Sequence, residues 1–170
     1  AAVGFFNDRV QQAMERKASE LLGADLVIAA PNPIRPELIE AARRQGLQTA
    51  ALQNFRSVVL AGDAMQLAEV KAAGPGYPLR GALLISDRPF GPARPADGIP
   101  NPGQVWVDER LLSALQRQVG DMVELGTGQF RIQQILTDEP DRAGAVFSIA
   151  PRVLMNLADV PATGLIQPGS

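Results

Sequence analysis

The sequence predicts an α+β fold, and three patterns within it support that class. Apolar residues recur every three or four positions along residues 3–22, as they do on one face of a helix. Residues 47–73 instead alternate with a period of two, which is typical of strands. Between residues 103 and 136, a strand pattern, a helix pattern and two further strand patterns follow one another. Helices and strands are therefore mixed along the chain.

The first predicted element is a helix over residues 3–22. Its apolar face consists of Phe6, Val10, Met14, Ala18, Leu21 and Leu22. Gly23 is placed to end this helix. The continuous apolar run of residues 24–30 predicts a short buried strand. A proline-rich connector follows, and a short helix is predicted over residues 37–45, with Pro36 in its first turn and Gly46 just beyond its end.

The middle of the chain predicts strands and one long loop. Within residues 47–73 we expect a β-hairpin that turns at Gly62 and Asp63, a pair that favours positive φ. Residues 81–86 predict a further apolar strand. Residues 87–103 are rich in proline and glycine and predict a loop, which is either an ordinary surface loop or a crossing between two lobes.

The remaining elements begin with a strand over residues 104–108. Asp108 is the expected N-cap of a helix over residues 109–118, and Leu111, Leu112 and Leu115 form its buried stripe. Two strands, residues 121–126 and 129–136, then form a predicted hairpin across a Gly-Thr-Gly turn. After a loop over residues 138–144, we expect a strand over residues 145–151 and a last helix over residues 152–157, opened by Pro151.

The composition excludes several classes of function. The 170 residues are 46% hydrophobic and 20% charged, so a buried core is expected. The net charge of −2 argues against a partner nucleic acid. The chain has no cysteine and no histidine, which removes thiolate catalysis, cysteine-type zinc sites and the commonest general base. No run approaches the roughly 20 apolar residues of a membrane span. Because an initiator Met and a signal peptide are both missing, we expect a piece of a longer chain.

Two groups of carboxylates are candidate sites. Asp138, Glu139 and Asp141 could hold Ca²⁺ or Mg²⁺, but they lack the spacing and the glycine of a calcium loop, so a solvated turn is the preferred interpretation. Asp108 and Glu109 could be an acid/base pair. Adjacent residues at a helix start do not face each other, so helix capping is preferred.

Other residues that could carry chemistry lack the partners that the chemistry needs. Ser86, Ser113 and Ser148 have no histidine, and the lysines, Lys17 and Lys71, lie in no recognisable motif. Gly126, Thr127 and Gly128 resemble part of a phosphate loop but join two strands, so a hairpin turn is expected. Tyr77 and Trp106 are expected to pack in the core or between lobes. The sequence therefore predicts no catalytic, cofactor-binding or metal-binding residue, and a hydrolase is disfavoured.

Four stretches carry a resemblance to a known family. They are LLGADLVI (residues 21–28), GQVWVDERLL (residues 103–112), VGDMVELG (residues 119–126) and APRVLMNLADVPATGLIQPGS (residues 150–170). Together with the order of elements over essentially the whole chain, they resemble the periplasmic core domain of MacB/FtsX-like ABC transporter permeases, and most of all the YbbP-like branch. None of the four is a catalytic signature.

The resemblance implies a two-lobed α+β domain. Residues 1–86 with 146–170 would form a porter-like split β-α-β lobe, and residues 87–145 an inserted, strand-rich sabre-like lobe. The resemblance also implies a periplasmic location in a bacterial inner-membrane protein, with flanking membrane helices and no cofactor.

The resemblance further implies a non-catalytic role. ATP hydrolysis on a separate cytoplasmic ATPase subunit would move this domain, with helix 3–22 as a lever. The domain would thereby act on lipids, lipoproteins, peptides or a periplasmic partner protein. The alternative is a static binding module that recruits an envelope protein or lipid.

Overall fold

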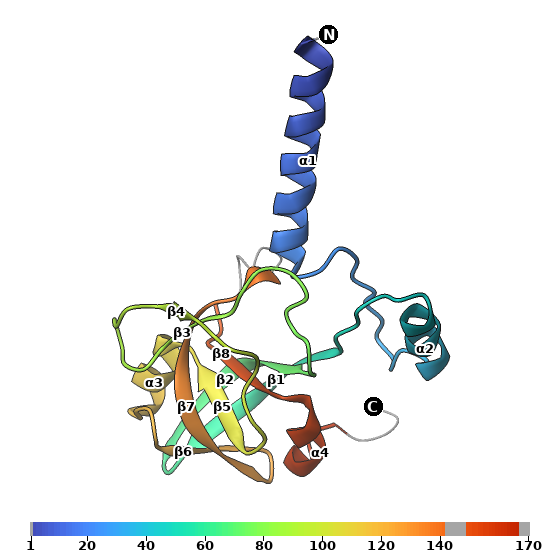
Figure 1. Cartoon of the computed structure of the whole chain (residues 1–170). Coiled ribbons are helices and arrows are strands. Elements are labelled where there is room, and N and C mark those ends of the chain that lie inside the picture. The colour runs from blue at the N-terminus through green and yellow to red at the C-terminus, as the bar shows by residue number, and fades with distance from the viewer. Residues whose placement is uncertain (1, 142–148, 167–170) are drawn as a thin grey trace.

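The computed structural model of the chain describes residues 2–141 and 149–166 (Figure 1). It contains one long helix that stands away from a compact body of strands, a short helix beside that body, and smaller helices packed on it. The α+β class predicted from the sequence is confirmed.

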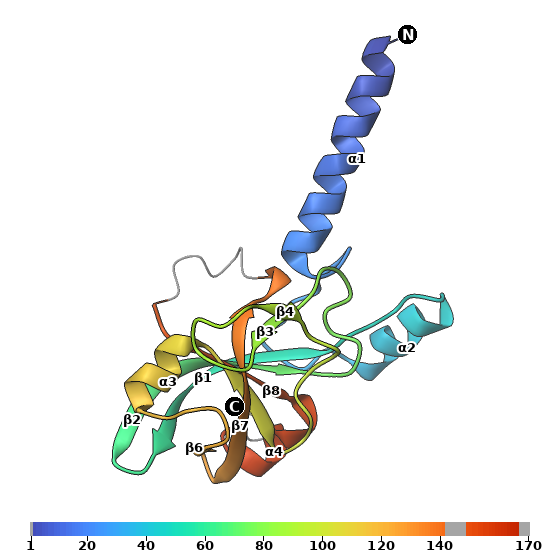
Figure 2. The ribbon, with the colours of Figure 1, turned by 60° about the vertical axis from the view of Figure 1, so that its left-hand side comes forward.

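Helix α1 spans Ala2–Leu22, in agreement with the predicted helix. It ends at Gly23, whose φ of +66° is accessible to glycine without strain. The side chains of residues 9–18 are all exposed, and both ribbon views show α1 clear of the strands (Figures 1 and 2). The stripe residues Val10, Met14 and Ala18 are therefore not packed against the described part of the body.

The predicted buried strand over residues 24–30 is wrong. These residues have no regular structure, and Leu26, Val27 and Ile28 are 74%, 53% and 61% exposed. An apolar run forms a strand only where another strand offers hydrogen bonds along its length, and the described structure places none there.

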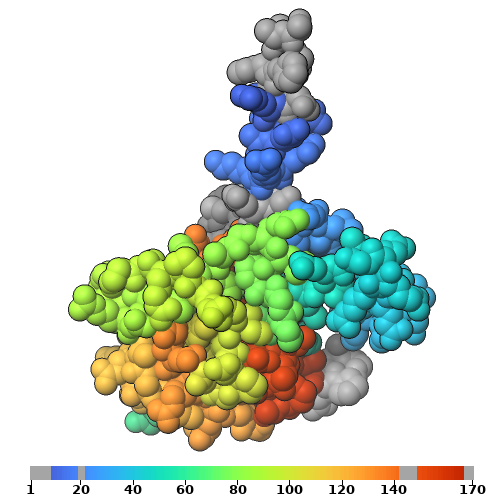
Figure 3. All heavy atoms as spheres, in the orientation of Figure 1, coloured from blue at the N-terminus to red at the C-terminus, as the bar shows by residue number. Residues whose placement is uncertain are grey.

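Helix α2, Pro36–Arg44, begins at the expected proline and ends before Gly46. None of its residues is buried. In the space-filling view it forms a separate bulge at the side of the body (Figure 3).

The body is built around a closed ring of strands. The ring strands are β1 (Leu52–Ala61), β2 (Ala64–Ala73), β5 (Gln104–Val107), β6 (Met122–Leu125), β7 (Gly128–Asp138) and β8 (Arg152–Asn156). Going round the ring, β7 pairs with β5, β5 with β8, β8 with β2, β2 with β1, β1 with β6, and β6 with β7 again. Only the β5–β7 and β2–β8 pairs are parallel. We call this ring the barrel. Closure gives each of its strands a neighbour on both sides.

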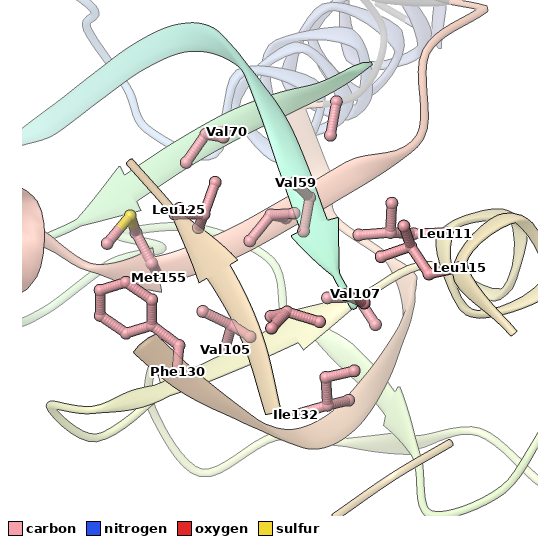
Figure 4. Packing of buried hydrophobic residues seen from close by; sticks show 14 of the residues in the cluster. Val59, Val70, Val105, Val107, Leu111, Leu115, Leu125, Phe130, Ile132 and Met155 are labelled. Carbon is pink, nitrogen blue, oxygen red and sulfur yellow. The ribbon is translucent and has the colours of Figure 1, made fainter. Parts of the chain in front are cut away.

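The barrel is filled by aliphatic side chains. Val59, Val105, Leu125, Ile132 and Met155 are fully buried and converge on its interior (Figure 4). Alternation along each strand places these residues inside and their neighbours outside. Both predicted hairpins are confirmed, because β1 turns into β2 at Gly62 and Asp63 and β6 turns into β7 through the Gly-Thr-Gly segment.

Helix α3, Glu109–Leu115, packs against β2 and β7. Its three leucines are buried as predicted and join the core of the barrel. Asp108 is its N-cap, since its Oδ1 accepts a hydrogen bond from the amide of Leu111 at 3.0 Å.

Two short strands extend the sheet beyond the barrel. β3 (Leu84–Ser86), the last part of the predicted strand 81–86, pairs antiparallel with the end of β7. β4 (Arg94–Pro95) pairs with β3 and is a brief strand inside the loop predicted for residues 87–103. A second apolar cluster lies here, outside the barrel; it contains Ala73, Tyr77, Leu83, Ile85, Trp106, Leu136 and Leu154.

The predicted helix over residues 152–157 is wrong. Residues Arg152–Asn156 are β8, which lies between β5 and β2. Val153 and Met155 face the barrel core while Leu154 joins the second cluster, so this strand is buried on both faces. Such a strand is continuously apolar and lacks the alternation that identifies a strand in a sequence.

Helical structure comes just after β8, as the 3₁₀ turn η2 (Leu157–Asp159) and helix α4 (Val160–Thr163). The predicted strand over residues 145–151 falls mainly outside the described residues.

Strands from both predicted lobes share the barrel. β1, β2 and β8 come from residues assigned to the porter-like lobe, and β5, β6 and β7 from residues 87–145. The division of the chain into two lobes stays a prediction.

Candidate functional site

Charged side chains gather on the outer side of β2, where β7 ends and β8 begins. The charge cluster consists of Lys71, Tyr77, Glu139, Asp141 and Arg152. Lys71 lies between Val70 and Ala72, which both face the barrel core. The alternation of the strand therefore directs the lysine outward.

Lys71 is the centre of this cluster. Its Nζ donates to Glu139 Oε2 at 2.8 Å and to Asp141 Oδ1 at 2.6 Å. It also lies 3.3 Å from the hydroxyl of Tyr77, which donates to the same Asp141 oxygen at 2.7 Å. Arg152 pairs with the other oxygen of Glu139. Two cations and two carboxylates thus balance their charges.

The cluster is largely shielded from solvent. The exposed fractions of the side chains are 16% for Lys71, 4% for Glu139, 19% for Asp141 and 12% for Arg152. Burial, followed by the negative charge of Asp141 and the hydrogen bond to it, raises the pKa of Tyr77 well above its ordinary value. Charges in such surroundings are stable only when paired, so the loss of one member leaves another uncompensated.

A cavity of about 240 Å³ adjoins the cluster. Its lining consists of Asp108, Glu109, Arg110, Leu136, Thr137, Asp138, Glu139 and Arg152. Both guanidinium groups are already paired, Arg110 with Asp108 at 2.8 Å and Arg152 with Glu139. Arg110 also donates to the carbonyl oxygens of Ile149 and Ala150. Both guanidinium groups of this cavity therefore already have carboxylate partners.

The C-terminal end of α1 rests on the loops that carry the cluster. The carbonyl oxygen of Gly23 accepts a hydrogen bond from the amide of Arg80 at 2.9 Å. The guanidinium of Arg80 binds both carboxylate oxygens of Asp25, at 2.9 and 2.6 Å. A Cβ on Gly23 would lie within 3.8 Å of Pro78, Pro140 and Asp141.

The three carboxylates of residues 138–141 are not the solvated turn that we expected. Glu139 is only 5% exposed, and Asp141 is held by Lys71 and Tyr77, while Asp138 stays exposed. Within residues 2–141 and 149–166, no group of three or more carboxylate side chains is arranged to hold a metal ion. Two of the three carboxylates instead neutralise basic residues.

The other candidates have structural roles, are exposed, or lie outside the described residues. Asp108 caps α3 as predicted, and Glu109 accepts a hydrogen bond from the amide of Phe90 at 2.7 Å, so the two carboxylates serve different segments. Ser86 is buried and bonds to the carbonyl of Arg88. Ser113 and Lys17 are exposed, and Ser148 lies outside the described residues.

The two amphipathic aromatic residues are buried, as predicted. Trp106 is 5% exposed and its Nε1 donates to Gln133 at 3.1 Å. Tyr77 is 4% exposed, and its contact with Lys71 and Asp141 was not foreseen. The Gly-Thr-Gly segment is a hairpin turn, and Thr127 fastens it to α4 through a hydrogen bond from its amide to the carbonyl of Thr163 at 2.9 Å.

Sequence reasoning missed the cluster because its members are far apart in the chain. Lys71 lies 68 residues from Glu139 and 70 from Asp141. One signal was present: a lysine stands in a segment whose neighbouring residues are Val70, Ala72 and Ala73.

Comparison with known proteins gives one informative match. No protein-family model matches the chain. The chain is 32% identical over 169 residues, 99% of its length, to a protein of Escherichia coli (strain K12) described as "Uncharacterized ABC transporter permease YbbP". The chain resembles a part of an ABC transporter permease. It spans 20% of that relative's length.

In the described part of the chain, none of the helices has the length and apolar character needed to cross a membrane.

Proposed function

We propose that the chain is a non-catalytic extracytoplasmic domain of a MacB/FtsX-like ABC permease in the bacterial inner membrane. ATP hydrolysis on a separate cytoplasmic ATPase subunit moves the membrane helices, and α1 transmits this movement to the barrel. The barrel then acts on lipids, lipoproteins, peptides or a periplasmic partner protein. The similarity to a permease over 99% of the chain carries this proposal.

The geometry of the chain suits mechanical transmission. At 1.5 Å per residue, α1 is about 30 Å long, and its described side chains from residue 9 to residue 18 are all exposed. The barrel is closed by hydrogen bonds and filled with aliphatic side chains, so it moves as a unit. A long helix attached to a stiff body transmits a displacement with little loss.

The polar chemistry of the chain also favours a non-catalytic role. The sequence has no histidine and no cysteine. The shielded charges of the charge cluster are paired with one another. We retain the porter-like lobe (residues 1–86 with 146–170) and the sabre-like lobe (residues 87–145) as part of this proposal.

The proposal is tested by interrupting α1 in the full permease. The permease and its ATPase are placed in lipid nanodiscs, and the distance from a spin label at Met65→Cys to labelled lipid headgroups is measured with and without nucleotide. Met65 is 68% exposed on the barrel. A flexible glycine linker inserted at Asp8 should abolish the nucleotide-dependent change in this distance. The same linker at Gly98 should preserve this change, because Gly98 is exposed and an added Cβ there would meet no atom within 4 Å.

A nucleotide-dependent change in distance that persists with the linker at Asp8, in a permease that folds normally, contradicts transmission through α1.

The location of the domain is tested separately, with a membrane-impermeant maleimide on the Met65→Cys permease. Labelling in intact spheroplasts is expected, and labelling only after lysis contradicts an extracytoplasmic domain.

A second candidate function is a static binding module that recruits an envelope protein or lipid. The observation that favours it is the exposure of Leu26, Val27 and Ile28, together with Leu38 and Leu47. The nucleotide experiment separates the two functions, because a static module keeps the same distance from the bilayer in every nucleotide state.

A further inference from the structure

Helix α1 meets the rest of the chain over a small area. Its described side chains from residue 9 to residue 18 are exposed, whereas Gly23 and Ala24, directly after it, are buried. Both ribbon views show the helix reaching the body only at this end (Figures 1 and 2). The direction of α1 relative to the barrel therefore depends on what lies under Gly23.

Two loops lie under Gly23, and the charge cluster holds both. The first contributes Pro78, which follows Tyr77. The second contributes Pro140 and Asp141, which follow Glu139 at the end of β7. Lys71 on β2 contacts Tyr77, Glu139 and Asp141 at once, so one barrel residue fastens both loops.

The cluster is better suited to fix α1 than the other ion pair at the junction. Arg80 and Asp25 have side chains that are 54% and 64% exposed. Exposed pairs of this kind contribute little because water and salt screen them. Asp141 is 19% exposed and accepts two short hydrogen bonds, from Lys71 and from Tyr77.

We infer that Lys71, Tyr77 and Asp141 form a joint that fixes the position of α1 on the barrel. They are positioning residues, because they act on α1 through the loops beneath Gly23. The geometric part of this inference concerns the chain alone. Its consequence, that the joint passes movement from α1 to the barrel, rests on the proposed function.

The joint is tested by measuring how α1 is distributed around the barrel. The chain has no cysteine, so two introduced cysteines carry the spin labels without background. The pair Met14→Cys and Met65→Cys uses exposed positions on α1 and on the barrel. Pulsed dipolar spectroscopy should give a narrow distance distribution with the joint intact. Asp141→Ala should broaden this distribution at least twofold.

Two controls separate the joint from other effects. The pair Met65→Cys and Met122→Cys reports on the barrel alone, and its distance should not change in Asp141→Ala. Arg80→Ala removes the exposed ion pair at the same junction and should leave the α1 distribution narrow. If Asp141→Ala does disturb the barrel pair, Tyr77→Phe serves instead, because it removes the hydroxyl and keeps the ring; it should still broaden the α1 distribution.

An unchanged α1 distribution in Asp141→Ala, with the barrel pair also unchanged, overturns the inference. An α1 distribution that broadens as much in Arg80→Ala as in Asp141→Ala also overturns it. Where Tyr77→Phe is used, an α1 distribution that stays narrow in that variant overturns it as well. In the full permease, Asp141→Ala should reduce the nucleotide-dependent movement of the barrel. If the joint holds in the chain and the unaltered permease shows no such movement, the proposed function fails and the joint stands.

Discussion

Every strand of the barrel has a partner strand on both sides, and the side chains in the interior of the barrel are buried. In residues 9–50, by contrast, Gly23 and Ala24 are the buried residues among those whose side chains are described. The barrel is thus stabilised by apolar burial, whereas the N-terminal region is positioned by a few contacts at the end of α1. A displacement of α1 can therefore occur without any loss of barrel core.

The largest expected effect is the loss of a core side chain. Leu125 is fully buried on β6, and Leu125→Ala should lower the free energy of unfolding by about 3 kcal/mol, because it removes buried methyl groups and leaves a cavity. Urea unfolding followed by the fluorescence of the single tryptophan measures this change. Leu67→Ala, at a half-exposed position on β2, should change the stability by less than about 0.5 kcal/mol. Equal losses in the two variants would contradict a barrel stabilised from its interior.

The next effect concerns the charge cluster. Lys71→Met should lower the free energy of unfolding by about 3 kcal/mol, since Asp141 and Glu139 lose a common cation in a shielded place. The same urea titration measures it. Arg56→Met breaks the exposed pair with Glu69 on the same hairpin and should cost less than about 0.5 kcal/mol. A Lys71→Met protein as stable as Arg56→Met would show that the cluster adds nothing to stability.

A smaller effect is expected at the hairpin turn between β6 and β7. A Cβ on Gly126 would lie 1.9 Å from the carbonyl oxygen of Thr163, and φ there is +58°. Gly126→Ala should cost about 2 kcal/mol in thermal or urea unfolding, through strain and lost contact with α4. Gly46 also has positive φ, with open space around it and no place in the barrel. Gly46→Ala should cost less than about 1 kcal/mol. A larger loss of stability in Gly46→Ala than in Gly126→Ala would mean that the contact with α4 is unimportant.

At high pH, the pH dependence of the free energy of unfolding should report on Tyr77, the only tyrosine in the sequence. Burial and Asp141 raise its pKa in the folded chain. The contribution of the neutral phenol to the stability of the fold is therefore fully present below about pH 10, which is the ordinary pKa of a tyrosine. Above that pH the unfolded chain loses the proton first, and this contribution to stability should fall by about 1.4 kcal/mol per pH unit.

Absorbance at 295 nm measures this ionisation directly. Tyrosinate should form at a higher pH in the folded chain than in urea, and Tyr77→Phe should lack the corresponding loss of stability. Ionisation at the same pH in both conditions would exclude a buried, hydrogen-bonded phenol.

The smallest effect is expected outside the barrel. Leu26→Ala removes an apolar side chain that is 74% exposed, and it should change the free energy of unfolding by less than about 0.5 kcal/mol. Urea unfolding of the chain measures this as well. A loss as large as that of Leu125→Ala would mean that residues 24–30 are packed in solution, and it would remove the contrast between the two regions.

Local patterns predicted the elements whose cause is local. The helical face of α1 ends at Gly23, the hairpin of β1 and β2 turns at Gly62, and Asp108 caps α3; each depends on residues within a few positions of one another. Apolar runs were less reliable. Residues 24–30 and 152–157 are both rich in apolar residues, yet the first segment has no partner strand and the second contains β8, a strand buried on both faces.

The charge cluster could not be predicted from neighbouring residues. Asp138, Glu139 and Asp141 look like a solvated acidic turn because carboxylates are normally exposed. What distinguishes Glu139 and Asp141 from Asp138 is the position of Lys71, and the pairing of β2 with β8 brings Lys71 to that place.

The sequence by itself determined the helix and hairpin positions, the capping of α3 and the absence of thiol and imidazole chemistry, because these follow from residue type and short spacing. Only the tertiary structure decided the closure of the barrel, the exposure of residues 25–30 and the pairing of Lys71 with Asp141. Those features depend on contacts between segments that are distant in the chain, and their energy comes from burial and charge pairing that no local pattern records.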